Sequence, residues 1–72
     1  MKFSERLKIL RERHNRTQGY VAKYLGVTQV AISNWERGEK QPSFQVLIDL
    51  AALFDVSTDY LLGITNNPAR NT

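Results

Sequence analysis

One short segment, residues 29–37, carries side chains that can recognise a nucleic acid. If it is a helix, successive residues lie about 100° apart, and one face holds two amides, a hydroxyl, an apolar side chain and a cation. These are Gln29, Asn34, Ser33, Val30 and Arg37. Amides can pair with adenine through two hydrogen bonds, and an apolar side chain can contact the methyl group of thymine. The pattern predicts a helix that reads bases, with an ordinary polar surface helix as the alternative.

The charge of the chain is unevenly distributed. Residues 1–40 contain nine Lys or Arg and four Asp or Glu, a formal charge of +5, whereas residues 41–72 contain one Arg and three Asp, a charge of −2. Excess cations in one part of a chain favour a polyanionic partner. A solvated basic surface explains the charge equally well.

Composition excludes several kinds of site. The 72 residues include no cysteine, so neither a disulfide nor a thiolate metal site is possible. The single histidine, His14, has no nucleophile or carboxylate cluster near it in the sequence, and we expect it to be a structural or surface histidine. We therefore predict no catalytic residue, no metal, no cofactor and no enzyme activity. Because neither a signal peptide nor a membrane span is evident, the predicted location is the cytoplasm.

The spacing of apolar residues predicts an all-α fold of five short helices. Four of them follow a residue that can cap a first turn, namely Thr17, Thr28, Ser43 or Ser57. Gly26 permits the sharp turn of a helix-turn-helix. The predicted helices cover approximately residues 4–14, 18–25, 29–37, 44–54 and 58–62, within a domain of residues 1–63. Residues 64–72 lose this periodicity and are predicted to be a polar flexible tail or the start of a linker.

Apolar periodicity also predicts which side chains are buried. In the first helix Phe3, Leu7, Leu10 and His14 are expected to point inward, and Arg6 is expected to face solvent with the other charges. The inward residues expected in the fourth helix are Phe44, Leu47, Ile48, Ala51 and Phe54. A second apolar group lies off that stripe and consists of Val46, Leu50 and Leu53. It either covers the fifth helix or forms a surface for self-association.

Arg11 is an unusual residue because its angle places it beside Leu7 and His14 on the inward side of the first helix. A charge in that position needs a partner or a route to water. Glu36, directly after the inward-facing Trp35, is the expected partner. The alternative is that the Arg11 side chain reaches solvent by itself.

Several motifs together carry a family resemblance. They are Thr17-Gln18, Val21-Ala22, Leu25-Gly26-Val27, the run ISNWERG at residues 32–38, Pro42-Ser43 and Asp59-Tyr60-Leu61-Leu62-Gly63. Over residues 3–63 the chain resembles the Cro/repressor-type helix-turn-helix regulators, which include lambda-like phage repressors and xenobiotic-response-element regulators of bacteria. The resemblance implies a five-helix domain that binds double-stranded operator DNA as a homodimer on a palindrome.

The resemblance also implies roles for individual residues. Gln29 and Val30 match the positions at which base reading begins, and Ser33 and Asn34 match later base contacts. Gln18 matches a family glutamine that touches the DNA backbone and braces the recognition helix.

Other contacts to DNA phosphates are expected from cations. Arg37 and Lys40 match family residues that meet phosphate, and we add Lys23 and Arg16 as candidates because of their charge. Arg16 departs from the family pattern, which usually has an apolar residue there. Tyr20 and Tyr24 replace residues that are usually charged. Asp55 stands where glycine is frequent.

Two functions from different classes follow from these observations. The first is a sequence-specific transcriptional regulator, a bacterial or phage repressor, with a C-terminal domain or a partner protein beyond residue 72. The second is a protein-interaction module on the same fold, such as an antitoxin or adaptor. Its contacts would come from Tyr20, Tyr24, Val46 and Leu53.

Overall fold

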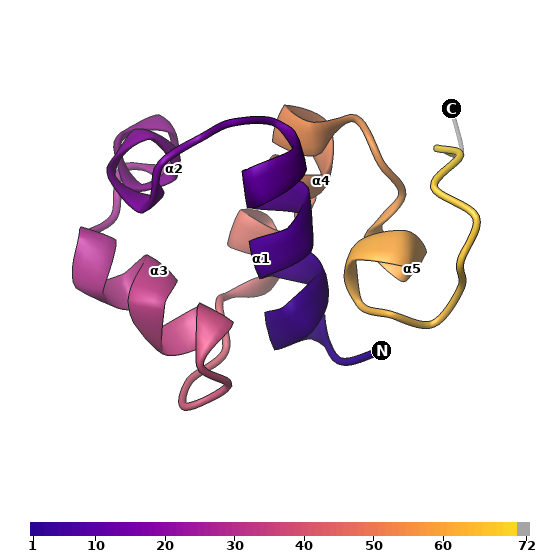
Figure 1. Ribbon diagram of the computed structural model, residues 1–72, viewed down its shortest axis with the longest axis horizontal. Coiled ribbons are helices and arrows are strands. Elements are labelled where there is room, and N and C mark those ends of the chain that lie inside the picture. The colour runs from indigo at the N-terminus through magenta and orange to yellow at the C-terminus, as the bar shows by residue number, and fades with distance from the viewer. Residues whose placement is uncertain (71–72) are drawn as a thin grey trace.

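The structure, a computed structural model, describes residues 1–70 and contains five α-helices and no strand in that range. The predicted all-α fold is confirmed. The helices are α1 (Phe3–Arg13), α2 (Gln18–Leu25), α3 (Gln29–Glu36), α4 (Phe44–Phe54) and α5 (Thr58–Leu61). α1 lies in the middle of the molecule, with α2 and α3 on one side and α5 on the other (Figure 1). In this described part, no helix is both long and apolar enough to cross a membrane.

The ends of three helices differ by one residue from the prediction. α1 begins at Phe3, and His14, Arg37 and Leu62 cap the ends of α1, α3 and α5 instead of belonging to them. Helix ends are the least sharply specified part of a periodic pattern, because a cap residue can share the apolar phase of its helix. The predicted bounds of α2 and α4 agree with the structure.

The predicted caps form at four helix starts. The side-chain oxygens of Thr17, Thr28, Ser43 and Ser57 accept the backbone N–H three residues later. Each bond satisfies one of the donors that a helix start leaves without an internal partner. These caps place the start of each helix at a defined residue.

One contiguous core holds the helices together. α1 packs against α3 and α5, α2 packs against α3 and α4, and α4 packs against α5. The largest side chains that this core buries completely are Leu7, Val21, Ile32, Leu50 and Leu61. Helices of eight to eleven residues are marginal in isolation, so packing of this core supplies most of their stability.

The predicted inward face of α4 is wrong at two positions. Phe44 is 86% exposed and Ile48 is 53% exposed, whereas Leu50, from the second apolar group, is fully buried. Val46 and Leu53 are partly buried against the core. α4 is apolar on most of its circumference, so its pattern does not select one inward side. Packing of α5 and Val56 against it makes that selection.

Arg6 is buried instead of facing solvent as expected. Only 3% of the residue is exposed, and its guanidinium lies 3.7 Å from the centre of the Tyr60 ring. Its Nη2 donates to Asn66 Oδ1 at 3.2 Å. The position is buried because α5 and the segment after it cover this side of α1. The cation–π contact with Tyr60 offsets part of the loss of hydration.

Residues 64–70 contain no helix but lie along α5 (Figure 1). The backbone N–H of Ser57 donates to the carbonyl of Pro68 at 3.0 Å, and Arg70 lies 3.6 Å from Asp55. The segment expected to be a flexible tail is therefore attached to the domain up to Arg70. The last two residues of that predicted tail lie outside the described part. A domain boundary at residue 63 stays a prediction.

Two glycines allow a direct test of the close approach between the chain start and the end of α5. Gly26 and Gly63 both have positive φ, but a Cβ on Gly26 would meet open space, whereas one on Gly63 would lie 1.8 Å from the carbonyl oxygen of Met1. Gly26→Ala should cost about 1 kcal/mol of unfolding free energy, the cost of a left-handed residue. Gly63→Ala should cost clearly more, as measured by urea denaturation. Equal losses would contradict the close approach.

Candidate nucleic-acid interface

α2, the turn and α3 form a helix-turn-helix. Gly26 ends α2 with a φ of 71°, and the N–H of Val27 donates back to the carbonyl of Ala22 at 3.0 Å. This is the hydrogen-bonding pattern of a glycine C-cap, and it turns the chain sharply. α3 then begins after Thr28 and buries Ile32 and Trp35 in the core. Its opposite face is consequently directed outward.

The outward face of α3 carries the side chains that were predicted to read bases. Gln29 and Val30 are exposed, Val30 at 68%, and Ser33 and Asn34 are partly exposed. Because most of the Val30 side chain is exposed, it contributes little to the packing of this domain. The arrangement offers donors, acceptors and one apolar group on a single helix surface, as direct readout in the major groove requires.

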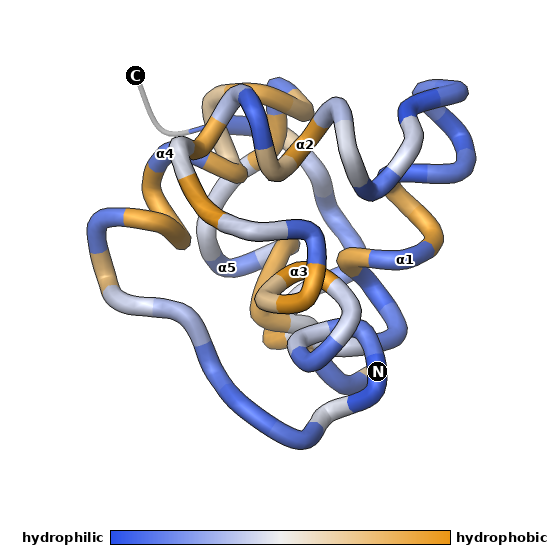
Figure 2. Tube along the Cα trace, turned by 90° about the vertical axis from the view of Figure 1, so that its left-hand side faces the viewer, coloured by the Kyte–Doolittle hydropathy of each residue, from blue (hydrophilic) through white to orange (hydrophobic). Residues whose placement is uncertain are grey.

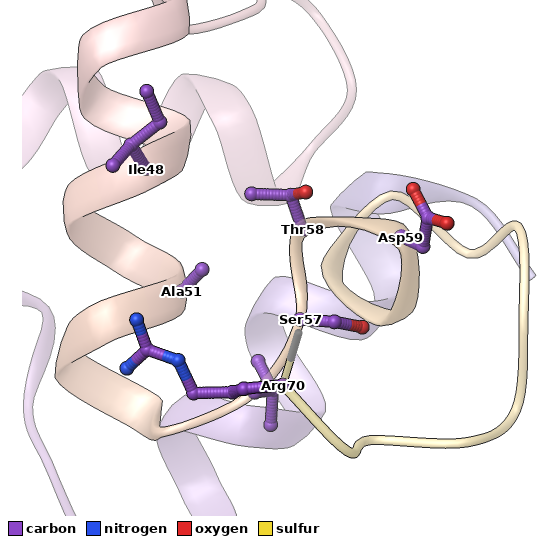
Figure 3. Close-up of a pocket in the computed structure, with 7 residues that line it drawn as sticks. Ile48, Ala51, Ser57, Thr58, Asp59 and Arg70 are labelled. Carbon is purple, nitrogen blue, oxygen red and sulfur yellow. The ribbon is translucent and has the colours of Figure 1, made fainter. Parts of the chain in front are cut away.

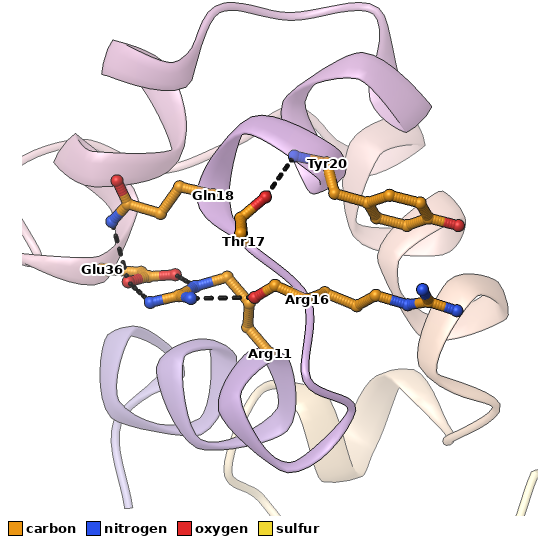
Figure 4. Close-up of polar contacts among 6 residues, drawn as sticks. All are labelled: Arg11, Arg16, Thr17, Gln18, Tyr20 and Glu36. Carbon is orange, nitrogen blue, oxygen red and sulfur yellow. Dashed lines mark hydrogen bonds and ion pairs between the residues drawn. The ribbon is translucent and has the colours of Figure 1, made fainter.

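A three-residue network joins α1, α2 and α3 (Figure 4). Arg11 Nε donates to Glu36 Oε2 at 2.6 Å and its Nη2 donates to Glu36 Oε1 at 3.1 Å. Gln18 Nε2 also donates to Glu36 Oε1, at 3.1 Å. The side chains of Arg11 and Glu36 are only 14% and 5% exposed. The predicted Arg11–Glu36 pair is thus present, and the bond from Arg11 to Glu36 raises the pKa of Arg11 above its usual value.

Gln18 has a partner that the sequence did not predict. Its side chain was expected to touch the DNA backbone and to brace the recognition helix, and in the structure its amide donates to Glu36, the last residue of α3. Gln18 therefore ties the first turn of α2 to the last residue of α3. A carboxylate that accepts bonds from both neighbouring helices holds α3 at a defined angle.

Two departures from the family pattern contact each other. The guanidinium of Arg16 lies 4.4 Å from the centre of the Tyr20 ring, a cation–π distance (Figure 4). The Arg16 carbonyl accepts a bond from Arg11 Nη1 at 2.9 Å. Arg16 is therefore held at the start of α2, with its charge beside the outer face of that helix. Neither contact was visible from sequence spacing.

Arg37 is the centre of a second polar cluster, at the end of α3. It donates to Ser33 Oγ and, at 2.6 Å, to Asn34 Oδ1, and both carboxylate oxygens of Glu39 accept from it at 3.2 Å. The bond from Arg37, with its charge, holds the pKa of Glu39 below its usual value. Arg37 was expected to reach a phosphate. Here it lies back along α3, and Glu39 is the partner that sequence analysis missed.

The other predicted phosphate contacts lie in separate places. Lys23 is exposed on α2, and Lys40 is exposed in the loop between α3 and α4. The structure brings Gln18, Gln29 and the Arg37 cluster onto the helix-turn-helix. Contact of any of these residues with DNA stays a prediction.

Residues 1–70 show little that suggests metal binding or catalysis. Within that range no group of three or more His, Asp or Glu side chains is placed to hold a metal ion. His14 was expected to point inward, but as the residue that caps the end of α1 it is exposed, with its ring centre 5.1 Å from that of Phe54. A hollow of about 160 Å³ between α4 and α5 is lined by Ser57, Asp59 and Arg70, among others (Figure 3). The Ser57 hydroxyl there already accepts from the backbone of Tyr60 as a helix cap.

Comparison with known proteins assigns the class to which this fold and surface belong. The helix-turn-helix family model matches residues 7–61, and the chain belongs to that family. The chain is a helix-turn-helix DNA-binding domain of the transcriptional-regulator class. The predicted Cro/repressor-type fold is confirmed.

Individual relatives support the same class. The chain is similar to the uncharacterized HTH-type transcriptional regulator YobD of Bacillus subtilis, at 36% identity over 92% of this chain and 59% of YobD. It is also similar to the c2 repressor of Salmonella phage P22, solved in complex with a synthetic operator. The identity to that structure is 37%, with a TM-score of 0.81 and coverage of 86% of this chain and 94% of the solved one.

The extent of these matches differs from protein to protein. The chain spans 50–59% of the length of the first three Bacillus subtilis relatives. The same fold is also part of the chain of HppE, solved with iron and a substrate, at 30% identity and a TM-score of 0.76 over 83% of this chain and 35% of HppE. Proteins of different length therefore contain this fold.

The network at Glu36 has a measurable effect on folding. Glu36→Ala leaves the guanidinium of Arg11 without its main partner, so we expect a loss near the lower end of the roughly 3–5 kcal/mol typical of a broken buried pair. Glu39→Ala removes the corresponding carboxylate of an exposed pair and should leave stability unchanged. Thermal and urea denaturation measure both variants.

If Glu36→Ala is too unstable to fold, Glu36→Gln keeps the shape and one acceptor oxygen while it removes the charge. It should then unfold at a lower urea concentration than the wild type. Equal midpoints for the Glu36 and Glu39 variants would refute a structural role for the network.

Proposed function

We propose that the chain binds double-stranded operator DNA and reads its sequence in the major groove with the outward face of α3. The observation that carries this proposal is the set of exposed polar and apolar side chains on a helix whose other side is buried. Gln29, Val30, Ser33 and Asn34 read base edges in this proposal. A helix tied to α1 and α2 through Glu36 presents those side chains without a further cost of ordering the helix backbone.

Phosphate contacts position the domain on the duplex. We propose that they come from Gln18, Lys23, Lys40, Arg16 and Arg37. Gln18 has one oxygen and a second amide hydrogen beyond its bond to Glu36. Arg37 has to exchange its bonds with Glu39, Ser33 and Asn34 for a phosphate. Its ion pair with Glu39 is exposed and therefore weak enough to allow the exchange.

The biological role follows from the class of protein. We propose a bacterial or phage repressor that acts as a homodimer on a palindromic operator, in the cytoplasm. A C-terminal domain or partner protein beyond residue 72 would complete it, which is consistent with relatives about twice as long. The repressor of phage P22, with its operator complex, supports operator DNA as the ligand. We propose binding without catalysis, because the described side chains that carry chemistry serve as caps, ion pairs or surface donors.

A protein-interaction module remains the second candidate, with Tyr20 and Tyr24 as its exposed aromatic contacts. Titration of duplex binding with salt separates the two functions. For a DNA-binding domain, log affinity falls linearly with log salt, by about 0.9 per phosphate contact. An interaction module binds no duplex at low salt.

Gln18 and Gln29 allow the proposal to be tested with a matched pair of variants. Operator and single-base variants are first obtained by selection from a random duplex pool. Gln29→Ala should lower affinity for the operator by about 1–3 kcal/mol and lower it little for the variant that lacks its base pair. Gln18→Ala should weaken all duplexes by a similar factor, because a phosphate contact carries no sequence information. Affinities at one salt concentration measure both effects. A uniform loss for Gln29→Ala would disprove base reading by that residue.

A further inference from the structure

Arg6 is a buried cation that has no anionic partner in residues 1–70. Only 3% of the residue is exposed, and no carboxylate within that range forms an ion pair with its guanidinium. The Tyr60 ring lies 3.7 Å from the guanidinium and covers one of its faces. An aromatic ring offsets only part of the cost of burying a charge. The position therefore favours an anion that the described part of the chain does not provide.

Arg11 shows which atoms of an arginine hold a carboxylate in this protein. Its Nε and Nη2 donate to the two oxygens of Glu36, at 2.6 and 3.1 Å. The same two atoms of Arg6 lack such a match. Nη2 donates to the neutral amide oxygen of Asn66 at 3.2 Å, whereas the buried Nε has no partner within residues 1–70. One oxyanion in the position of Asn66 Oδ1 satisfies both donors, because a guanidinium pairs with two oxygens at once.

A hollow of about 190 Å³ lies beside this guanidinium. The described residues that line it include two cations and no acid, and they are Met1, Arg6, Ile9, Arg13, Tyr60 and Asn66. A water molecule occupies roughly 30 Å³ in the liquid, so the hollow is large enough for a small oxyanion such as acetate or phosphate. Arg13 is exposed at its edge, and its charge attracts an anion from solution.

Access to the buried Nε depends on Asn66. This residue is exposed and belongs to a segment without helix, so its side chain can turn toward solvent while α1 and α5 stay in place. Its bond to Arg6, at 3.2 Å, is at the long end of the range for an N–H donor. An oxyanion forms a shorter, charge-assisted bond in the same place. The exchange of Asn66 Oδ1 for a ligand oxygen is therefore favourable.

The hollow lies away from the proposed recognition surface. α5 and residues 64–70 lie on the other side of α1 from α3 (Figure 1), and Figure 2, viewed from the side of α2 and α3, shows α5 behind them. The contact between Arg6 and Tyr60 is on the α5 side of α1. The anion of this site is therefore a ligand separate from the duplex.

We propose that Arg6 and Arg13 bind a small oxyanion, a carboxylate or a phosphate, in the hollow between α1, α5 and Asn66. Two oxygens of the ligand accept from Nε and Nη2 of Arg6 in place of Asn66 Oδ1, and Arg13 adds a second positive charge. The inference does not depend on DNA binding, because none of these residues belongs to the proposed recognition surface.

Nuclear magnetic resonance of the ¹⁵N-labelled 72-residue chain tests the site, with sodium phosphate and sodium acetate as separate probes. The Nε–H signal of Arg6 and the backbone signals of Tyr60 and Asn66 should shift and saturate. We expect a Kd on the order of 1–10 mM, as suits a ligand of few atoms. Sodium chloride at matched ionic strength should give no saturable shift at these residues. Saturation by only one of the two probes assigns the ligand as a phosphate or as a carboxylate.

Asn66→Asp places a carboxylate beside the same two donors of Arg6, and Asn67→Asp is its matched control. The control makes the same change of charge one residue further on. There Asn67 Oδ1 accepts from the backbone of Ala69, and an aspartate oxygen can do the same. Asn66→Asp should bind either probe at least tenfold more weakly than the wild type, because its own carboxylate occupies the site. Asn67→Asp should stay within about twofold of the wild type, because salt screens an exposed charge.

The proposal is supported by saturable binding that Asn66→Asp removes and Asn67→Asp keeps. It is overturned if neither probe gives a saturable shift of the Arg6 signals in the wild type. Equal binding by the two variants also overturns it, because the anion then binds elsewhere on the basic surface.

Discussion

The hydrogen bonds that Glu36 accepts fix the orientation of α3, and the proposed recognition surface depends on that orientation. Its carboxylate accepts from Arg11 on α1 and from Gln18 on α2, while the residue itself ends α3. A helix of eight residues has little stability alone, so the core residues Ile32 and Trp35 hold α3 in place. Glu36 adds direction, because charge-assisted bonds to two helices constrain the angle of the third. The outward face of α3 is thus preorganised before any ligand arrives.

Much of the fold could be predicted from local signals. Capping residues and Gly26 set the helix limits, since each acts on the turn next to it. Two predictions failed where the answer depends on distant segments. Phe44 and Ile48 were expected inside because α4 is apolar on several sides, and only the docking of α5 selects the buried one. Arg6 was expected outside because its cover comes from Tyr60 and Asn66, more than fifty residues away.

The candidate site likewise has one part that could be predicted from the sequence and one part that could not. Helical periodicity alone predicts that Gln29 and Val30 face outward once Ile32 and Trp35 are buried, and the Arg11–Glu36 pair follows from the need to match a charge on an inward face. The remaining contacts depend on side-chain conformations in space. The bond from Gln18 to Glu36, the stacking of Arg16 on Tyr20 and the bonds between Arg37 and Glu39 leave no signal in residue spacing. Family resemblance suggested roles for Gln18 and Arg37 but not their partners.

In the proposed complex, the outward face of α3 enters the major groove. Nuclear magnetic resonance of the ¹⁵N-labelled chain, titrated with a selected duplex, measures this directly, because the side-chain amides of Gln29 and Asn34 give their own signals. These two amides and the backbone N–H groups of α3 should show the largest shift changes, with smaller changes along α2. A response confined to α4, α5 and residues 64–70, or no response at low salt, would contradict the claim.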